Sequence, residues 1–141
     1  MSKRERVVSE AYRWLGTTYH HQGRVIGAGV DCAMILCEVY YAAGLIPYID
    51  PRPYPHDWHL HKSGERYMGW LDQYAQVVSA PLPGDVALYR FARAASHGAI
   101  VIEWPTVIHA LLGEGVVLDC GERETFKNRL VGFWRLRGID E

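Results

Sequence analysis

Three segments in the first half of the chain have apolar residues at helical spacing. The first spans residues 3–15 and is followed by Gly16, a common helix stop. The second follows Asp31, a preferred N-cap, and runs to Gly44; the third spans residues 65–77. The apolar positions are Val7, Val8, Ala11, Trp14 and Leu15; then Ala33, Leu36, Val39, Tyr40 and Ala43; then Tyr67, Trp70, Leu71 and Tyr74. This pattern predicts three helices.

The pattern changes at residues 80–85, a turn cluster rich in proline and glycine. Short segments rich in β-branched and aromatic residues follow it, at residues 86–91, 98–104, 106–112, 115–119 and 131–136. Helices followed by closely spaced strands predict an α+β fold with helices packed on a mainly antiparallel sheet of five to six strands. We expect one domain over residues 1–141, with a helical half at about 3–77 and a strand half at about 84–136.

Composition narrows the possible partners and compartments. With 49% hydrophobic residues in 141, the chain can bury a core, and its net charge of −1 gives no electrostatic reason to expect nucleic acid or an anionic membrane as a partner. The N-terminus has no apolar signal segment, and no stretch approaches the roughly 18 apolar residues of a membrane span. We therefore expect cytoplasmic synthesis without a signal peptide. Three cysteines cannot all pair, which favours a reduced protein.

Cys32 is the strongest candidate for chemistry, because it follows the predicted N-cap and lies in the first turn of the second helix. Free backbone N–H groups and the positive end of the helix dipole favour a thiolate there. The charge of Asp31 opposes this effect, so full activation requires a neighbouring cation, most plausibly an imidazolium. Cys37 and Cys120 lie among apolar neighbours without a partner motif, and we assign them no catalytic role.

Two histidines in the strand half can supply a base and a group that orients it. A tight turn at residues 103–106 predicts that the strands carrying His97 and His109 pair antiparallel, with both histidines near one end of the sheet. If the Cys32 helix begins at that end, Cys32, His97 and His109 form a nucleophile, base and orienter. In that arrangement the Cys32 backbone N–H would donate to the oxyanion, with the Tyr19 hydroxyl as a possible second donor. Alternatively, each histidine could be a structural strand residue.

Other polar residues are weaker candidates. Arg24 and Tyr19 lie in a glycine-containing loop at residues 17–29 that leads to the Cys32 helix, so Arg24 is a weak candidate for substrate binding. Three closely spaced histidines, His56, His59 and His61, could bind zinc, but no obvious fourth ligand accompanies them. We therefore expect no metal, and we expect no cofactor. Arg90 and Arg93 could contact a substrate carboxylate, although a solvated strand end explains them as well.

The sequence resembles the NlpC/P60 family of cysteine peptidases over roughly residues 5–136. The resemblance rests on four motifs in order, with Tyr19 upstream: Asp31-Cys32-Ala33, Pro83-Gly84-Asp85, Ser96-His97-Gly98-Ala99-Ile100 and Val107-Ile108-His109-Ala110. Met34 is bulkier than the residue usual at its position in the family. The resemblance implies a papain-like fold with Cys32 as nucleophile, His97 as base and His109 as the residue that orients it.

The resemblance also implies a substrate, the stem peptides of bacterial peptidoglycan, cut through a thioester intermediate. Residues 55–61, together with the short chain, further resemble phage or prophage members associated with tails, so phage tail proteins are possible partners and the virion a possible location. Two alternatives remain open. One is a catalytically silent structural or assembly component with the same fold, indicated by aromatic residues between 47 and 74. The other is acyl transfer by the same residues to an acceptor other than water.

Overall fold

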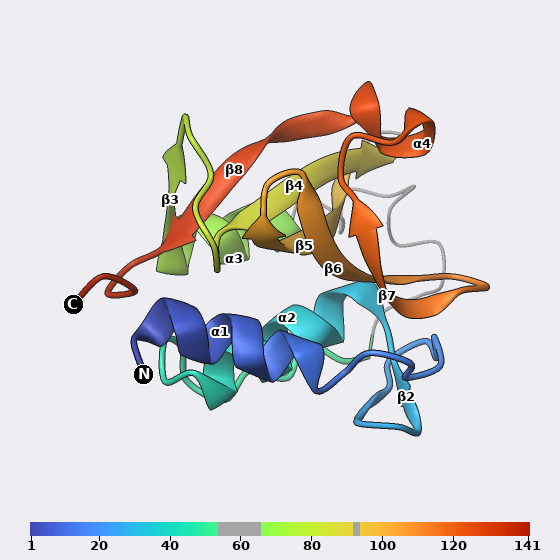
Figure 1. The fold of residues 1–141 in the computed structure, drawn as a ribbon. Helices are drawn as coiled ribbons and strands as arrows, with labels where there is room; N and C mark the ends of the chain where they lie inside the picture. The colour runs from blue at the N-terminus through green and yellow to red at the C-terminus, as the bar shows by residue number, and fades with distance from the viewer. Residues whose placement is uncertain (54–65, 92–93) are drawn as a thin grey trace.

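The computed structural model describes residues 1–53, 66–91 and 94–141. Helices pack against one face of a six-stranded sheet in which every neighbouring pair is antiparallel, in the order β3-β8-β4-β5-β6-β7. Figure 1 shows α1 and α2 lying side by side below this sheet, and their contact with each other is direct. The main helices are α1 (Lys3–Tyr12), α2 (Cys32–Ala42) and α3 (Arg66–Tyr74). The strands are β3 (Ala75–Val78), β4 (Val86–Phe91), β5 (Ala94–Glu103), β6 (Thr106–Leu111), β7 (Gly115–Cys120) and β8 (Leu130–Leu136).

The predicted α+β fold class is confirmed, and the differences are local. The first helix ends at Tyr12, before the predicted residue 15, and the third ends at Tyr74 because the following residues pair with β8 as the edge strand β3. β5 begins at Ala94, four residues earlier than predicted, because it continues to pair with β4 beyond His97. The predicted loop at residues 17–29 contains a small antiparallel pair, β1 (Arg24–Val25) and β2 (Gly29–Val30). The single-turn helix α4 (Glu124–Lys127) was not predicted.

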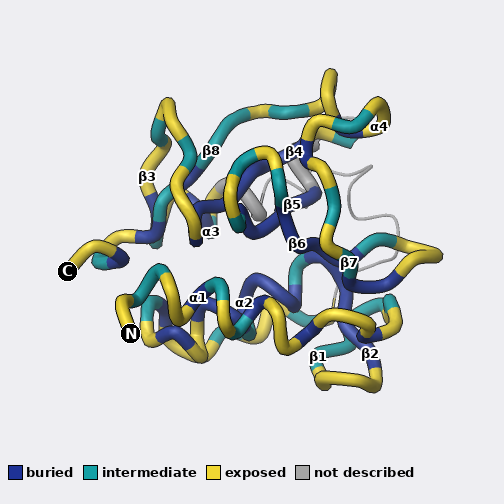
Figure 2. The backbone as a smooth tube through the Cα atoms, in the orientation of Figure 1, coloured by how far each residue is buried: buried dark blue, intermediate teal, exposed yellow. Residues whose placement is uncertain are grey.

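The central strands are buried on both faces, as the continuous dark blue of β4 and β6 in Figure 2 shows. On the helix side, the main core joins α1, α2 and α3 to the sheet through residues such as Ile100 and Ile108. On the opposite side, a second cluster centres on Tyr89 and on Phe126 of α4. Because neighbouring strand residues point to opposite faces, residues 97, 99 and 101 of β5 share the face of this second cluster.

Asp85 ties the N-terminal helix to the sheet. Its fully buried carboxylate pairs with Arg4 of α1 at 3.2 Å and with Arg135 of β8 at 2.8 Å, and it accepts a hydrogen bond from the Leu82 backbone. Arg4 also binds Asp140, whose carboxylate is 60% exposed. A buried charge is tolerated only when its partners satisfy it, so these contacts make Asp85 the electrostatic anchor between α1 and the sheet.

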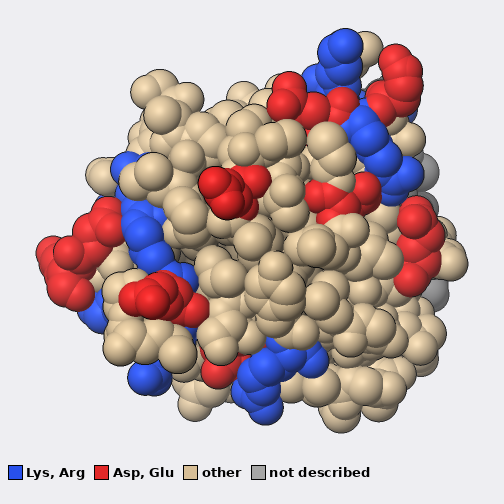
Figure 3. All heavy atoms as spheres, viewed as in Figure 1, with Lys and Arg blue, Asp and Glu red and all other residues tan. Residues whose placement is uncertain are grey.

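The face of the molecule drawn in Figure 3 carries charges of both signs. Acidic and basic side chains are scattered over it, with broad uncharged areas between them. Among the described residues, none of the helices combines the length and apolar character that crossing a membrane requires.

We predict that Asp85→Asn lowers the free energy of unfolding by about 3 kcal/mol, because it removes the buried charge that pairs with two partly buried guanidinium groups. Asp140→Asn is the matched control and should cost less than about 1 kcal/mol, since that carboxylate is exposed to solvent. Urea unfolding of the two variants measures both values. Equal losses would show that Asp85 does not anchor α1.

Candidate active site

Asp31 caps the helix that begins with Cys32, as the sequence predicted. Its carboxylate accepts hydrogen bonds from the backbone N–H groups of Ala33 and Met34, at 3.2 and 2.9 Å, and from that of Gln22 at 2.8 Å. The cap therefore fixes the start of α2 and also holds the preceding loop against it. Cys32 lies in the first helical turn and is 8% exposed.

Tyr19 reaches Cys32 because the loop before α2 is tightly folded. Tyr19 bridges to Val30, and hydrogen bonds on either side of it run from His20 N to Val30 O and from Val30 N to Thr18 O. A Cβ on Gly29 would lie 2.6 Å from the Cβ of His20, so only glycine permits this approach. The Tyr19 hydroxyl lies beside the Cys32 thiol and acts to lower its pKa. The predicted proximity of Tyr19 to the thiol is thus present, and its oxyanion role stays a prediction.

The Cys32 thiol is protonated in the resting protein. Burial raises its pKa to about 12, and the charge of Asp31 adds to this effect. The Tyr19 hydroxyl and the backbone N–H groups of Cys32 and Ala33 act in the opposite direction but do not outweigh burial. The helix start therefore offers donors for an anion without generating a resting thiolate.

His97 and His109 are in direct contact, as predicted. Nε2 of His97 lies 2.9 Å from Nδ1 of His109, and both residues are buried. The contact follows from the turn at residues 103–106, which joins β5 to β6 in a register that pairs Ile100 with Ile108. The ring of Phe126 stacks on His97 at 5.9 Å and contacts His109 at 5.1 Å. The two imidazoles therefore belong to the sheet face that α4 covers.

Both histidines are neutral at pH 7. Burial, together with the neighbouring His109, lowers the pKa of His97 to about 3. Burial also lowers the pKa of His109, although its hydrogen bond to Asp119 raises it in part. A neutral imidazole can accept a proton, which a base requires.

Asp119 of β7 is a site residue that sequence reasoning missed. Its Oδ2 lies 2.9 Å from Nε2 of His109 and 3.0 Å from Nε of Arg123. β7 pairs with β6 so that Val117 faces His109, which makes Asp119 its diagonal neighbour on the same face. The sequence did contain a signal for this contact. A glycine-containing turn joins the predicted strands at residues 106–112 and 115–119, and pairing these strands places Asp119 beside His109.

Cys32 and the histidine pair come from elements that pack together. α2 contacts both β5 and β6, and Figure 1 shows its N-terminal end at the side of the molecule where β6 ends. The structure thus brings His97 together with His109, and Cys32 with Tyr19 and Asp31; the proton transfer between the two groups stays a prediction.

Arg24 has internal partners. Its guanidinium, 7% exposed, pairs with Glu38 of α2, donates to the Ile49 carbonyl at 2.9 Å and stacks 4.5 Å above the Tyr48 ring. These contacts hold the segment after α2 against the β1–β2 hairpin. Its predicted contact with substrate stays untested.

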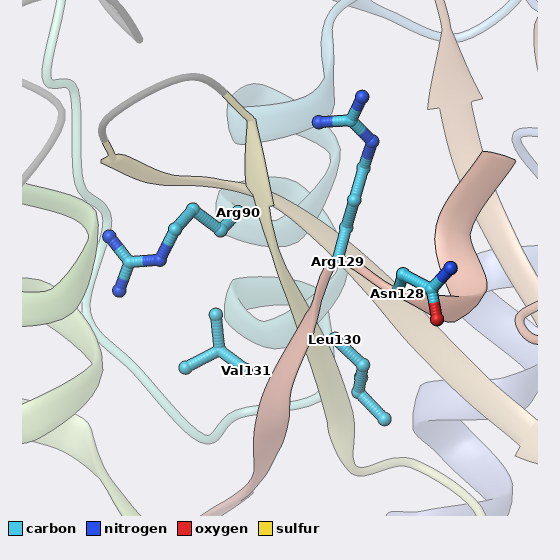
Figure 4. A pocket seen from close by; sticks show the side chains of 5 residues that line it. All are labelled: Arg90, Asn128, Arg129, Leu130 and Val131. Atoms are coloured by element: carbon cyan, nitrogen blue, oxygen red, sulfur yellow. The ribbon is translucent and has the colours of Figure 1, made fainter.

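A surface hollow of about 440 Å³ adjoins the histidine site. Arg90, Asn128, Arg129, Leu130 and Val131 line it, and Figure 4 shows the two guanidinium groups pointing in different directions. Arg129 stacks 4.7 Å above Phe91, which in turn contacts the His97 ring. The hollow therefore lies one aromatic ring away from the imidazole pair.

The histidines considered for zinc, His56, His59 and His61, lie outside the described residues, as does Arg93. Within residues 1–53, 66–91 and 94–141, no three His, Cys, Asp or Glu residues are grouped as a metal site would need.

Comparison with known proteins identifies the fold. No family model matches the sequence, and no curated protein matches it. Solved structures do match. An NLP/P60 family protein of Staphylococcus aureus, similar to a lipoprotein, aligns with 95% of this chain at a TM-score of 0.67 and 19% identity. The NlpC/p60 domain of the peptidoglycan hydrolase SagA aligns with 93% of the chain at 0.60 and 22%.

A third match, RipD of Mycobacterium tuberculosis, aligns with 98% of the chain at a TM-score of 0.61 and 15% identity, and is described as non-catalytic and adapted to peptidoglycan binding. The chain spans 96% of the SagA domain and 98% of the RipD structure, but 41% of the Staphylococcus aureus protein. It therefore has the NlpC/P60 fold, which includes both hydrolases and a non-catalytic protein.

We predict that the free energy of unfolding falls as the pH is lowered from 7 toward 4.5, the range in which histidines titrate. The folded state holds the pKa of His97 near 3, below its ordinary 6.5, so below pH 6.5 the unfolded state binds a proton that the folded state does not. His97→Gln should reduce this loss by about 1.4 kcal/mol per pH unit below pH 6. Urea unfolding between pH 7 and 4.5 measures the slope. An unchanged slope in His97→Gln would contradict the neutral, buried state of His97.

Proposed function

We propose that this chain is a thiol hydrolase that cuts the stem peptides of bacterial peptidoglycan. The observation that carries the proposal is the contact between His97 and His109 on the two strands against which the Cys32 helix packs. A buried, neutral imidazole held by a second imidazole is the arrangement that a cysteine nucleophile needs as its base. The substrate class comes from the resemblance in motifs and from structural neighbours that include a peptidoglycan hydrolase.

The chemistry follows from the atoms around Cys32. Nδ1 of His97 removes the thiol proton, and the sulfur attacks the carbonyl carbon of the scissile amide. The resulting oxyanion is stabilised by the Cys32 backbone N–H and the Tyr19 hydroxyl. His97 then returns its proton to the leaving amine, and the C–N bond breaks to leave a thioester on Cys32. Water attacks the thioester with His97 again acting as base, which releases the acid product and restores the thiol.

Substrate binding has to complete this arrangement. The thiol pKa of about 12 and the His97 pKa of about 3 mean that a resting thiolate–imidazolium pair is not stable. Hydrogen bonds between catalytic groups are often long in a free enzyme and shorten in the complex with substrate. We therefore propose that the proton moves only as the sulfur–carbon bond forms.

The proposal includes a biological setting, a phage tail whose enzyme cuts the cell wall locally. Its support is the sequence resemblance of residues 55–61 to tail-associated members. On this view the chain is one domain over residues 1–141 that becomes part of the virion, with tail proteins as partners.

A second candidate function is peptidoglycan binding or tail assembly without cleavage. The specific observation in its favour is that Cys32 is buried and that this burial raises the pKa of its thiol to about 12, which disfavours a reactive thiolate. The non-catalytic structural neighbour shows that the fold can be used in this way.

We predict that the wild-type protein releases stem-peptide fragments from purified sacculi and that Cys32→Ala reduces the rate at least about a thousandfold, because it removes the nucleophile. Mass spectrometry of the soluble fragments measures the rate and identifies the bond. Cys37→Ala is the matched control and should retain activity.

Binding to the sacculi, measured by co-sedimentation, separates the two candidate functions. A hydrolase binds with or without Cys32 but cuts only with it. If wild type and Cys32→Ala both bind and neither releases fragments, the hydrolase proposal is wrong and the binding function stands.

A further inference from the structure

A line of hydrogen bonds runs from the sheet edge into the candidate site. It joins Arg123 to Asp119, Asp119 to His109 at 2.9 Å and His109 to His97 at 2.9 Å. We infer that Asp119 fixes which nitrogen of each imidazole carries the proton, so that Nδ1 of His97 is the one unprotonated nitrogen of the pair that does not already accept a hydrogen bond from the other ring. Asp119 is thus a positioning residue acting through His109, and its catalytic meaning rests on the proposed function.

The assignment follows from counting donors along the line. An ionised carboxylate only accepts hydrogen bonds, so Nε2 of His109 must carry a proton and donate to Asp119. A neutral imidazole has one N–H, so Nδ1 of His109 is an acceptor, and Nε2 of His97 must donate to it. The single N–H of neutral His97 is therefore on Nε2, where it donates to His109, and Nδ1 of His97 keeps its lone pair. No hydrogen bond within the described chain occupies that nitrogen.

Asp119 is held in its ionised form. Burial alone would raise the pKa of this carboxyl, but the hydrogen bonds from His109 and the Cys120 backbone and the charge of Arg123 outweigh burial and lower it. Nε and Nη2 of Arg123 lie 3.0 and 2.9 Å from Oδ2, and Cys120 N lies 2.8 Å from Oδ1. Both carboxylate oxygens therefore accept hydrogen bonds, which favours the ionised form of Asp119.

Few of the described groups around the His97 and His109 rings compete with Asp119 for hydrogen bonds to them. Phe126 covers both imidazoles, and Tyr89 and Phe91 of β4 contact His97 through their rings. The Tyr89 hydroxyl is engaged with the Gly121 carbonyl. Of the described charged groups, Asp119, Arg123 and Glu114 act on His109, and Asp119 acts on His97. The carboxylate of Asp119 is the one that bonds directly to the pair.

Asp119→Asn tests the assignment because an amide cannot satisfy all of these donors. If its oxygen accepts from Cys120 N, its NH₂ group faces His109 and Arg123. Nε2 of His109 must then become an acceptor, which moves the proton to Nδ1 of His109 and, in turn, to Nδ1 of His97. The base nitrogen of His97 is then blocked. If the oxygen faces His109 instead, the NH₂ group opposes the Cys120 N–H.

The experiment is ¹⁵N NMR of the histidine rings in the intact protein at pH 7, without substrate. In the wild type we expect the proton on Nε2 of both His97 and His109. Asp119→Asn should move a measurable fraction of both rings to the Nδ1–H form, and Asp119→Glu, which keeps an accepting carboxylate, should restore the wild-type form. Asp140→Asn is the matched control, because it removes an Arg–Asp contact at another site and should leave both rings unchanged.

Activity provides the second readout. We expect Asp119→Asn to lower kcat for stem-peptide release on the order of a hundredfold or more with little change in KM, because it disables the base without touching the substrate. Wild-type protons on Nε2 together with absent cleavage would defeat the proposed function and leave this inference standing. Unchanged ring protonation in a folded Asp119→Asn variant would overturn the inference, whatever the activity.

Discussion

The account depends on the burial of two imidazoles that have to be neutral and hydrogen-bonded at the same time. His97 and His109 lie between the β5–β6 pair and the Phe126 ring, where a charge is costly and an unpaired polar atom is nearly as costly. The antiparallel register of β5, β6 and β7 meets this constraint by bringing His109 between His97 and Asp119. The demand for satisfied hydrogen bonds leaves one nitrogen of the pair for chemistry.

The same burial determines how the thiol can act. Cys32 has helix donors and the Tyr19 hydroxyl around its sulfur, yet burial and Asp31 hold its pKa at about 12. Asp31 is nonetheless required, because its carboxylate caps α2 and binds the preceding loop. The site therefore combines a precisely placed, protonated nucleophile with a neutral base. Such a site favours proton transfer during attack on the substrate over a preformed ion pair.

Much of this arrangement could be predicted from the sequence. Apolar spacing and the Asp31 cap located the Cys32 helix, and the turn at residues 103–106 was enough to bring His97 and His109 together. Asp119 was missed because its role depends on the pairing of β6 with β7, which a strand pattern alone does not fix. β3 was hidden at the end of an apolar helical pattern, because its pairing with β8 is a long-range contact. The internal contacts of Arg24, which the sequence offered only as a weak candidate for substrate binding, could not be predicted because its partners, Glu38 and the Ile49 carbonyl, lie far along the chain.

The central claim is that the His97 ring serves as the base for the Cys32 thiol. The most direct measurement is the rate of alkylation of Cys32 by iodoacetamide at pH 7, followed by peptide mass spectrometry in the wild type and in His97→Ala. Cys120 is exposed and serves as an internal control in the same sample. The account predicts that loss of His97 slows alkylation of Cys32 at least about tenfold, since His97 takes the thiol proton as the sulfur reacts, and leaves Cys120 unchanged. Equal rates for Cys32 in the two proteins would contradict it.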